Sequence, residues 1–157
     1  MPCEELTVEP VRNMAEAHSA IAVDSLIFKK PTPTQFFSLA VTRNDVFILY
    51  LARNKQEIAG YSLATVVKEE AEIVSVGVLP RMRNMGIGVA LISSLVETAT
   101  KRGAQRLLLE VRLSNNPAIA LYRSTGFKTV AVRRKYYRNP SEDALVMSRP
   151  LETEISL

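Results

Sequence analysis

Residues 73–88 read IVSVGVLPRMRNMGIG, and this stretch decides the fold that the sequence predicts. Its first part, 73–79, is apolar and rich in β-branched residues, which favours a strand ending at Pro80. The apolar spacing at 87–102 then predicts a helix. Gly103 follows that helix, where a glycine in the left-handed conformation commonly ends one. A strand, a loop with glycines and arginines, and a long helix are therefore expected in succession.

The loop carries the pattern R-x-x-G-x-G, formed by Arg83, Gly86 and Gly88. The first N–H groups of a helix have no partner within it and carry partial positive charge, so they bind anions. Glycines let the backbone approach an oxyanion, and arginine adds a forked donor, so a diphosphate suits this loop. The spacing matches neither the lysine-containing phosphate loop nor the dinucleotide fingerprint. Taken alone, a glycine pair serving only a tight turn explains it as well.

The rest of the chain alternates strands and helices around this unit. Further helices are expected at 14–27, at a short segment through Phe36, Phe37 and Leu39, and at 117–124, the last capped by Ser114 or Asn115 and ended by Gly126. Further strands are expected at 46–52, 58–67, 107–111, 128–134 and 143–147, with Asn54 and Lys55 turning the first hairpin. This order predicts a three-layer α/β domain around a mostly antiparallel sheet, with residues 1–157 forming one domain.

Composition excludes several classes of protein. The hydrophobic share of 47% and the charged share of 23% are ordinary for a globular chain and argue against disorder. The longest apolar stretch, 46–52, is too short to cross a bilayer, and the acidic N-terminus has no secretory signal. Cys3 is the only cysteine, so an internal disulfide is impossible and no metal site is expected. These features predict a cytoplasmic protein without a membrane partner.

The net charge of +4 is mild and allows three interpretations. The basic residues that contribute to it include Arg81, Arg83, Lys101, Arg102, Arg106 and the run 133–135. A nucleic-acid-binding protein, an enzyme for an anionic cofactor and a solvated basic face all fit this distribution.

Downstream blocks make the interpretation specific. They are LEVR at 109–112, SN at 114–115, AIALY at 118–122, GF at 126–127, RRKYY at 133–137, EDA at 142–144 and Met147. Together with R-x-x-G-x-G they resemble the GNAT superfamily of N-acetyltransferases. Within it, the text is similar to the branch of bacterial ribosomal-protein alanine acetyltransferases and archaeal N-terminal acetyltransferases. The resemblance spans 73–151, roughly half of the chain.

This resemblance implies a GNAT fold, which is a mostly antiparallel seven-stranded sheet with splayed central strands and about four helices. It also implies acetyl-CoA as the acetyl donor. The residues expected to bind it are Val76, Gly77, Val78, Arg83, Asn84, Met85, Gly86, Ile87, Gly88, Val89, Asn115 and Tyr122. Gly77 is expected at a β-bulge that separates its strand from the next, with simple packing as the alternative. Asn115 can serve the site and cap its helix at once.

Acetyl transfer to an amine needs a base, donors for an oxyanion and an acid. The resemblance assigns Glu110 as the general base, and its place in an apolar strand suits a functional carboxylate. The alternative is an ion pair with Arg112, its neighbour on the same face of the strand. Tyr122 is assigned as the general acid, and the alternative is a core aromatic residue packed with Ala118 and Ile119.

Acceptor binding is assigned by the same resemblance to Tyr136 and Tyr137. The alternative is an alternating pair in a hairpin, with one ring buried and the other exposed. Glu72 is kept as a weaker second base. Catalytic roles for Cys3 and His18 are not expected.

One segment departs from the family pattern. Where relatives often carry a Leu-Pro-Glu-Asn-Tyr-like lip between the first two helices, residues 28–33 read FKKPTP. The glutamate is absent and two lysines are present, so the first residue of the acceptor stays open, with serine or alanine as the guess.

The leading hypothesis is transfer of acetyl from acetyl-CoA to the N-terminal α-amine of proteins or peptides, in an enzyme that could act at the ribosome. A lysine side chain or a small amine is the first alternative acceptor. A non-catalytic module that binds acetyl-CoA or associates with nucleic acid is the second alternative, although no specific nucleic acid is expected.

Overall fold

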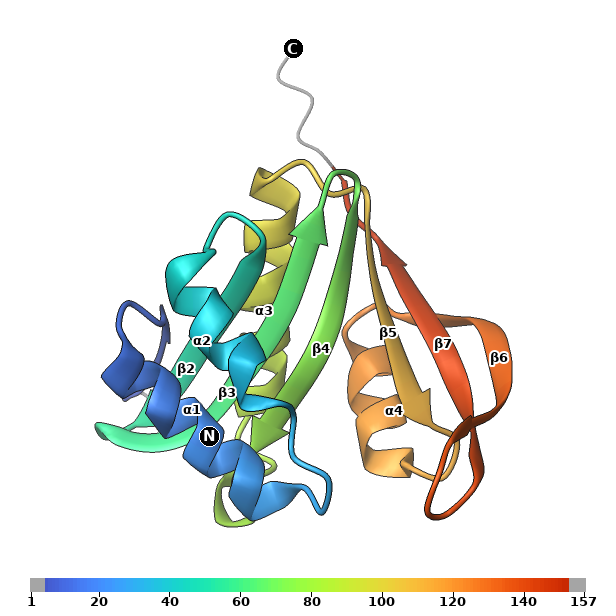
Figure 1. Ribbon diagram of the computed structural model, residues 1–157, viewed down its shortest axis with the longest axis horizontal. Helices are drawn as coiled ribbons and strands as arrows, with labels where there is room; N and C mark the ends of the chain where they lie inside the picture. The colour runs from blue at the N-terminus through green and yellow to red at the C-terminus, as the bar shows by residue number, and fades with distance from the viewer. Residues whose placement is uncertain (1–4, 153–157) are drawn as a thin grey trace.

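The computed structural model describes residues 5–152 and shows one seven-stranded sheet (Figure 1). The strands are β1 (Leu6–Pro10), β2 (Phe47–Asn54), β3 (Glu57–Val67), β4 (Glu70–Val78), β5 (Arg106–Arg112), β6 (Lys128–Tyr137) and β7 (Glu142–Pro150). Their order across the sheet is β1-β2-β3-β4-β5-β7-β6. Only β4 and β5 pair in parallel; the other neighbours are antiparallel. The expected mostly antiparallel seven-stranded α/β fold is thus confirmed.

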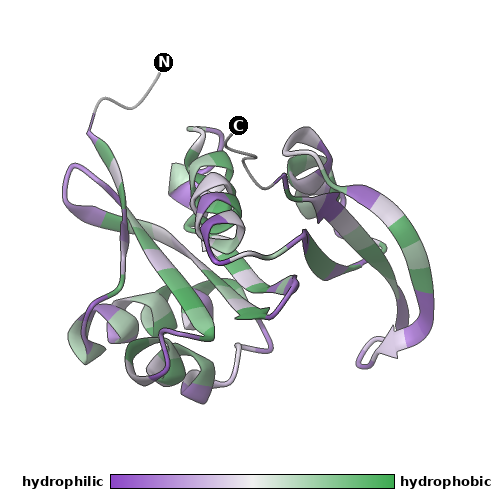
Figure 2. Ribbon diagram, turned by 90° about the horizontal axis from the view of Figure 1, so that it is seen from above, coloured by the Kyte–Doolittle hydropathy of each residue, from purple (hydrophilic) through white to green (hydrophobic). Residues whose placement is uncertain are grey.

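Helices cover both faces of this sheet, as Figure 2 shows from above. The α-helices of the described segment are α1 (Met14–Ile27), α2 (Thr34–Thr42), α3 (Ile87–Lys101) and α4 (Asn116–Ser124), with a short 3₁₀ turn at Pro80–Met82. One buried cluster joins α1 and α2 to β2 and β3 through Phe37, Leu51 and Tyr61. A second joins α3 and α4 to the opposite face through residues such as Leu95 and Ile119. The sheet is therefore the middle layer of three, as its element order predicted.

The two central strands separate after a short paired segment. Residues 70–72 of β4 pair with residues 106–108 of β5, and beyond that point the strands diverge (Figure 1). The later half of β4 therefore keeps β3 as its neighbour and offers its other edge to a ligand. This is the splay that the family resemblance implied.

The bulge in β4 lies three residues before its expected position. In the pairing with β3, Leu63 faces Ser75 and Ala64 faces Ile73, so Val74 is the extra residue. The expectation of a bulge at Gly77 was wrong, because Gly77 pairs regularly with Tyr61. A Cβ on Gly77 would lie 2.8 Å from Cε1 of Tyr61, so glycine is required there by packing.

Most elements lie within two residues of their expected bounds. Strand β4 begins at Glu70, three residues before its expected start, and β7 ends at Pro150, three residues after its expected end. Three further differences concern β1, the first hairpin turn and the end of β6.

Strand β1 was not expected, because it has only five residues and little apolar pattern. It lies at the edge of the sheet, and its position is set by its pairing with β2. The first hairpin turns at Lys55 and Gln56, both with positive φ, while Asn54 still belongs to β2. Strand β6 extends to Tyr137. Within residues 5–152 no helix is both long and apolar enough to cross a bilayer.

Candidate functional site

A pocket of about 410 Å³ opens where β4, the start of α3 and the start of α4 meet. It is lined by Ile27, Phe28, Val76, Gly77, Val78, Met82, Arg83, Asn84, Gly86, Ile87, Gly88, Val89, Asn115, Pro117, Ala118 and Leu121. Ten of the twelve residues expected to bind acetyl-CoA are in this set. The two exceptions are Met85, whose side chain is exposed, and Tyr122, which lies in the core behind the lining.

The loop before α3 has the geometry of an anion site. Asn84 and Gly86 both have positive φ, 63° and 78°, which turns the backbone sharply into the helix. No side chain caps α3, so its first N–H groups are available to a ligand. A Cβ on Gly86 would meet nothing within 4 Å, so the loop is open on that side. Arg83 adjoins it, and its Nε donates to the carbonyl oxygen of Val78 at 3.2 Å.

The opposite wall of the pocket belongs to α4. Asn115 caps this helix by accepting a hydrogen bond from the backbone N–H of Ala118 at 3.3 Å, and it also lines the pocket. A Cβ on Gly88 would lie 3.0 Å from Cδ2 of Leu121, so α3 and α4 approach each other closely here. Glycine is thus needed at position 88 because Leu121 leaves little room for a side chain, whereas at position 86 it is favoured by the positive φ.

Glu110 lies on β5 in the split between the central strands, with its side chain 18% exposed. Its Oε1 is 3.3 Å from Nη1 of Arg133. The alternative of an ion pair with Arg112 was wrong, because Arg112 pairs with Glu142 at 3.8 Å and donates to the backbone of the β6–β7 turn. The cross-strand register brings Arg133 rather than the same-strand neighbour to the carboxylate.

Tyr136 and Tyr137 contact each other and the same carboxylate region. Their rings are 5.1 Å apart at an interplanar angle of 90°. Side-chain hydrogen bonding with Glu110, followed by burial, raises the pKa of Tyr136. Burial, with Glu110 as the second cause, raises the pKa of Tyr137 to about 12.

The strict alternation considered for these tyrosines is broken at Lys135. Its φ is 51°, and its N–H donates to Oδ1 of Asp143 at 2.8 Å. This irregularity lets two consecutive rings meet edge to face. Tyr137 also carries the guanidinium of Arg112 over its ring, 4.4 Å from the centroid. The two rings therefore lie against each other, although their burial differs: Tyr136 is 43% exposed and Tyr137 is half-buried.

Tyr122 is 8% exposed and packs edge to face on Phe127, with ring centroids 5.6 Å apart. Burial, followed by the nearby Tyr137, raises its pKa to about 12. Glu72 is the last residue of β4 that pairs with β5, and burial, followed by the nearby Glu110, raises its pKa. These mutual effects on pKa link five side chains at the split into one electrostatic cluster, which consists of Glu72, Glu110, Tyr122, Tyr136 and Tyr137.

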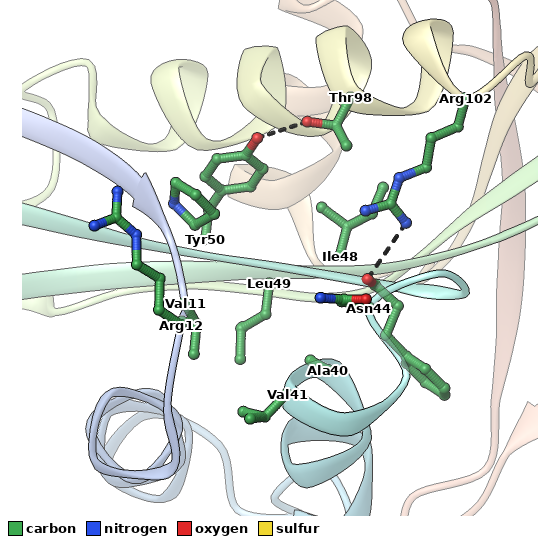
Figure 3. Close-up of a pocket in the computed structure, with 12 residues that line it drawn as sticks. Val11, Arg12, Ala40, Val41, Asn44, Ile48, Leu49, Tyr50, Thr98 and Arg102 are labelled. Atoms are coloured by element: carbon green, nitrogen blue, oxygen red, sulfur yellow. Dashed lines mark hydrogen bonds between the residues drawn. The ribbon is translucent and has the colours of Figure 1, made fainter.

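A second hollow of about 510 Å³ lies beyond the end of β1, between α2 and α3 (Figure 3). Tyr50 and Thr98 share a hydrogen bond of 2.6 Å there, and Arg102 reaches the carbonyl oxygen of Phe47 at 3.5 Å. None of the expected site residues lines this hollow. It is a separate feature of the β2 edge.

The remaining expectations concern residues without a role in the cluster. His18 is exposed on α1, and Cys3 lies outside the described residues. Across residues 5–152 no group of histidine, cysteine or carboxylate side chains is arranged to hold a metal.

Sequence reasoning missed several lining residues, among them Ile27, Phe28 and Leu121. A signal was available for Leu121, which lies one helical turn after Pro117 and Ala118. None was available for Ile27 and Phe28, because they reach the pocket only through the packing of α1 on β4.

The Acetyltransferase (GNAT) family matches residues 14–127, more than half of the chain. The chain belongs to the GNAT family. GNAT acetyltransferases use acetyl-CoA as the acetyl donor. The residues present fit this donor, because the uncapped start of α3, the open glycine turn and Arg83 suit a diphosphate.

Two relatives illustrate where this GNAT protein lies within the family. The [ribosomal protein bS18]-alanine N-acetyltransferase of Escherichia coli K12 is 34% identical over 116 residues, which cover 73% of this chain and 78% of that protein. The N-alpha-acetyltransferase of Sulfurisphaera tokodaii is 32% identical over 157 residues, covering 90% and 92%.

The crystal structure of the E. coli ribosomal-protein-S18-alanine N-acetyltransferase has the same fold as this GNAT protein. The two superpose with a TM-score of 0.82 at 28% identity, covering 96% of this chain and 97% of that one. The fold and the family expected from the sequence are both confirmed.

Proposed function

We propose that this protein transfers the acetyl group of acetyl-CoA to the α-amine at the N-terminus of a protein or peptide. The observation that carries the proposal is the position of Glu110 in the split between β4 and β5, flanked by Tyr136 and Tyr137. The pocket beside the split suits the donor, and Tyr136, which is 43% exposed, can be reached by an acceptor. The named reactions of the E. coli and S. tokodaii relatives support the same assignment.

Bound acetyl-CoA supplies a reactive thioester, and the chain supplies the proton transfers. Glu110 is assigned as the general base, which takes a proton from the acceptor ammonium directly or through a water molecule. A free α-amine has a pKa of about 8, so a substantial fraction is protonated at neutral pH and needs such a base.

Tyr122 is assigned as the general acid. Its pKa of about 12 keeps the hydroxyl protonated at physiological pH, so a proton is available there for the leaving group. The backbone of residues 76–78 is assigned to the oxyanion and the donor's arm, because that edge of β4 has no β5 partner. Glu72, in the same cluster, is the second candidate base.

The acceptor is proposed to be a protein, and the substrate named for the E. coli relative supports the proposal of a ribosomal acceptor and a cytoplasmic location. Residues 28–33 differ from the lip sequence that relatives often carry between the first two helices, so that segment does not define the first residue of the acceptor. A small first residue, serine or alanine, is proposed.

Release of free CoA from acetyl-CoA over a peptide panel tests the proposal. The panel holds peptides beginning with Ser, Ala, Thr or Met, and matched peptides with a blocked α-amine and an internal lysine. Release with free α-amines alone is the expected result. Release with blocked peptides would reassign the acceptor to lysine, and no release with any peptide would reject a peptide acceptor in favour of small amines or a binding role.

A further inference from the structure

The carboxylate of Asp24, in the last turn of α1, is 1% exposed. Three hydrogen bonds converge on it. The backbone N–H and the hydroxyl of Thr32 donate at 2.7 and 2.8 Å, and the hydroxyl of Tyr61 donates to Oδ1. Among the ion pairs of the described chain, none involves Asp24. A buried carboxylate is unfavourable without such donors, so these bonds hold the α1–α2 loop firmly against it.

The same network continues into β4. The oxygen of Tyr61 lies 2.6 Å from Oγ of Ser75, next to the bulge at Val74. The carboxylate of Asp24 can only accept hydrogen bonds, so the hydroxyl of Tyr61 donates its single proton to Asp24. The oxygen of Tyr61 can then only accept from Ser75, so the hydroxyl of Ser75 is the donor in that bond. Burial raises the pKa of Tyr61, which keeps that donor protonated. The chain of bonds therefore runs from the α1–α2 loop through β3 to β4.

The two ends of this network support two walls of the same pocket. Ile27 and Phe28 form one wall, and the N–H of Phe28 donates to the carbonyl oxygen of Asp24 at 3.0 Å. Residues 76–78 form the other wall. A Cβ on Gly77 would lie 2.8 Å from Cε1 of Tyr61 and 3.2 Å from Cδ1 of Ile27, so both side chains pack directly on the β4 backbone.

The loop is also held on its outer side. Nζ of Lys30 donates to the carbonyl oxygen of Arg138 at 3.1 Å, which links the α1–α2 loop to the β6–β7 hairpin across the split. Asp24 fixes the inner end of the loop and Lys30 its outer end. The loop is thus positioned between the donor pocket and the tyrosines assigned to the acceptor.

We propose that Asp24 is a positioning residue for acetyl transfer, which through Thr32, Tyr61 and Ser75 sets the spacing between the α1–α2 loop and β4. This inference rests on the proposed function and adds a residue that positions the walls of the site without contacting the substrates. Asp24 touches neither the diphosphate loop nor Glu110. Its loss is expected to lower peptide turnover more strongly than it weakens the binding of acetyl-CoA. The walls that the network supports also line the donor pocket, but the start of α3, where the diphosphate is proposed to bind, lies outside the network.

The test compares Asp24→Asn, Tyr61→Phe and Thr32→Val with the wild type. The Asp24→Asn change places an amide N–H₂ against donors, Tyr61→Phe removes the link to Ser75, and Thr32→Val removes one hydroxyl at constant shape. Thr34→Val is the matched control, because Thr34 lies at the start of α2 and its hydroxyl makes no hydrogen bond with Asp24. The measurements are kcat and KM for the peptide, Kd for acetyl-CoA, and Tm.

The expected result is a fall in kcat/KM for the peptide of about tenfold or more in Asp24→Asn and Tyr61→Phe, and a smaller fall in Thr32→Val. The Kd for acetyl-CoA should rise by less than about threefold in each variant, because the start of α3 does not depend on the network. Thr34→Val should match the wild type in every measurement.

Two results would overturn the inference. One is a kcat/KM for the peptide equal to the wild-type value in both Tyr61→Phe and Thr32→Val. These two variants test the inference even if Asp24→Asn does not fold. The other is a parallel loss of acetyl-CoA affinity and peptide turnover, which indicates general loosening of the fold. A wild-type protein inactive on every peptide would instead reject the proposed function itself.

Discussion

Oε1 of Glu110 lies 3.3 Å from Nη1 of Arg133, so the carboxylate in the split of the sheet is paired with a residue of β6. Arg133 is 23 positions away in the chain and also lies beside the ring of Tyr136, 5.3 Å from its centroid. One ion pair thus joins the proposed base to the strand that carries the proposed acceptor-binding tyrosines.

Glu110→Gln should lower peptide turnover by on the order of a hundredfold, because Gln cannot accept the proton of the acceptor ammonium. The Kd for acetyl-CoA should be unchanged, since Glu110 does not line the donor pocket. Steady-state kinetics and calorimetric titration measure the two quantities. Glu97→Gln, on the exposed face of α3, is the control. Wild-type turnover in Glu110→Gln would remove Glu110 from the mechanism and turn attention to Glu72.

Tyr122→Phe should lower kcat about tenfold to a hundredfold while keeping the ring contact with Phe127. Tyr50→Phe removes a hydroxyl from the separate hollow at the β2 edge and should leave kcat unchanged. A kcat for Tyr122→Phe equal to that of Tyr50→Phe would show that Tyr122 is a core residue only.

The pH profile of the wild type gives a further check on Tyr122. Since its pKa is raised to about 12, the phenol stays protonated well above neutrality. The value of kcat/KM should therefore show no loss of activity from deprotonation of Tyr122 up to about pH 10. A descending limb below pH 10, absent in the Tyr122→Phe variant, would contradict the raised pKa.

Glu72→Gln should stabilise the protein at neutral pH. Burial raises the pKa of Glu72, with Glu110 as the second cause, so the folded state binds the proton more tightly than the unfolded state does. The ionised carboxylate therefore weakens the fold, and stability falls as pH rises through the interval between the two pKa values. The variant should gain about 1 °C in Tm at pH 7 and less at pH 4. Glu69→Gln, in the turn before β4, is the control, and an equal gain at both pH values would contradict the electrostatic cause.

Gly86→Ala should weaken acetyl-CoA binding, because a side chain at φ 78° strains the loop that precedes α3. Gly103→Ala is the matched control, with φ 89° and open space at the other end of the same helix. Both variants should lose about 1 kcal/mol of unfolding free energy, or roughly 3 °C in Tm. Only Gly86→Ala should raise the Kd for acetyl-CoA, by about fivefold or more, and equal Kd values in the two variants would argue against a diphosphate at this loop.

Local patterns predicted the helices and most strands, because apolar periodicity, prolines and capping residues act over a few positions. Helix α1 at Met14–Ile27 and the start of α3 at Ile87 lie where they were expected. Strand β1 was missed because five residues with one edge pairing carry little pattern of their own. Asp24 gave a weak signal, as an acid four residues after Ala20 on a buried helix face, but nothing near it in the chain indicates its partners.

The sequence by itself determined the order of elements from α1 to β7, the position of the glycine-containing loop before α3 and, through its ordered blocks, the family. These properties depend on neighbouring residues or on motif spacing. Only the tertiary structure decided that Glu110 pairs with Arg133, that the bulge lies at Val74, and that Asp24 joins the α1–α2 loop to β4. Each of these depends on the register between strands or on helix packing across the sheet. Such relationships are set by the simultaneous burial of segments far apart in the chain, which no local pattern encodes.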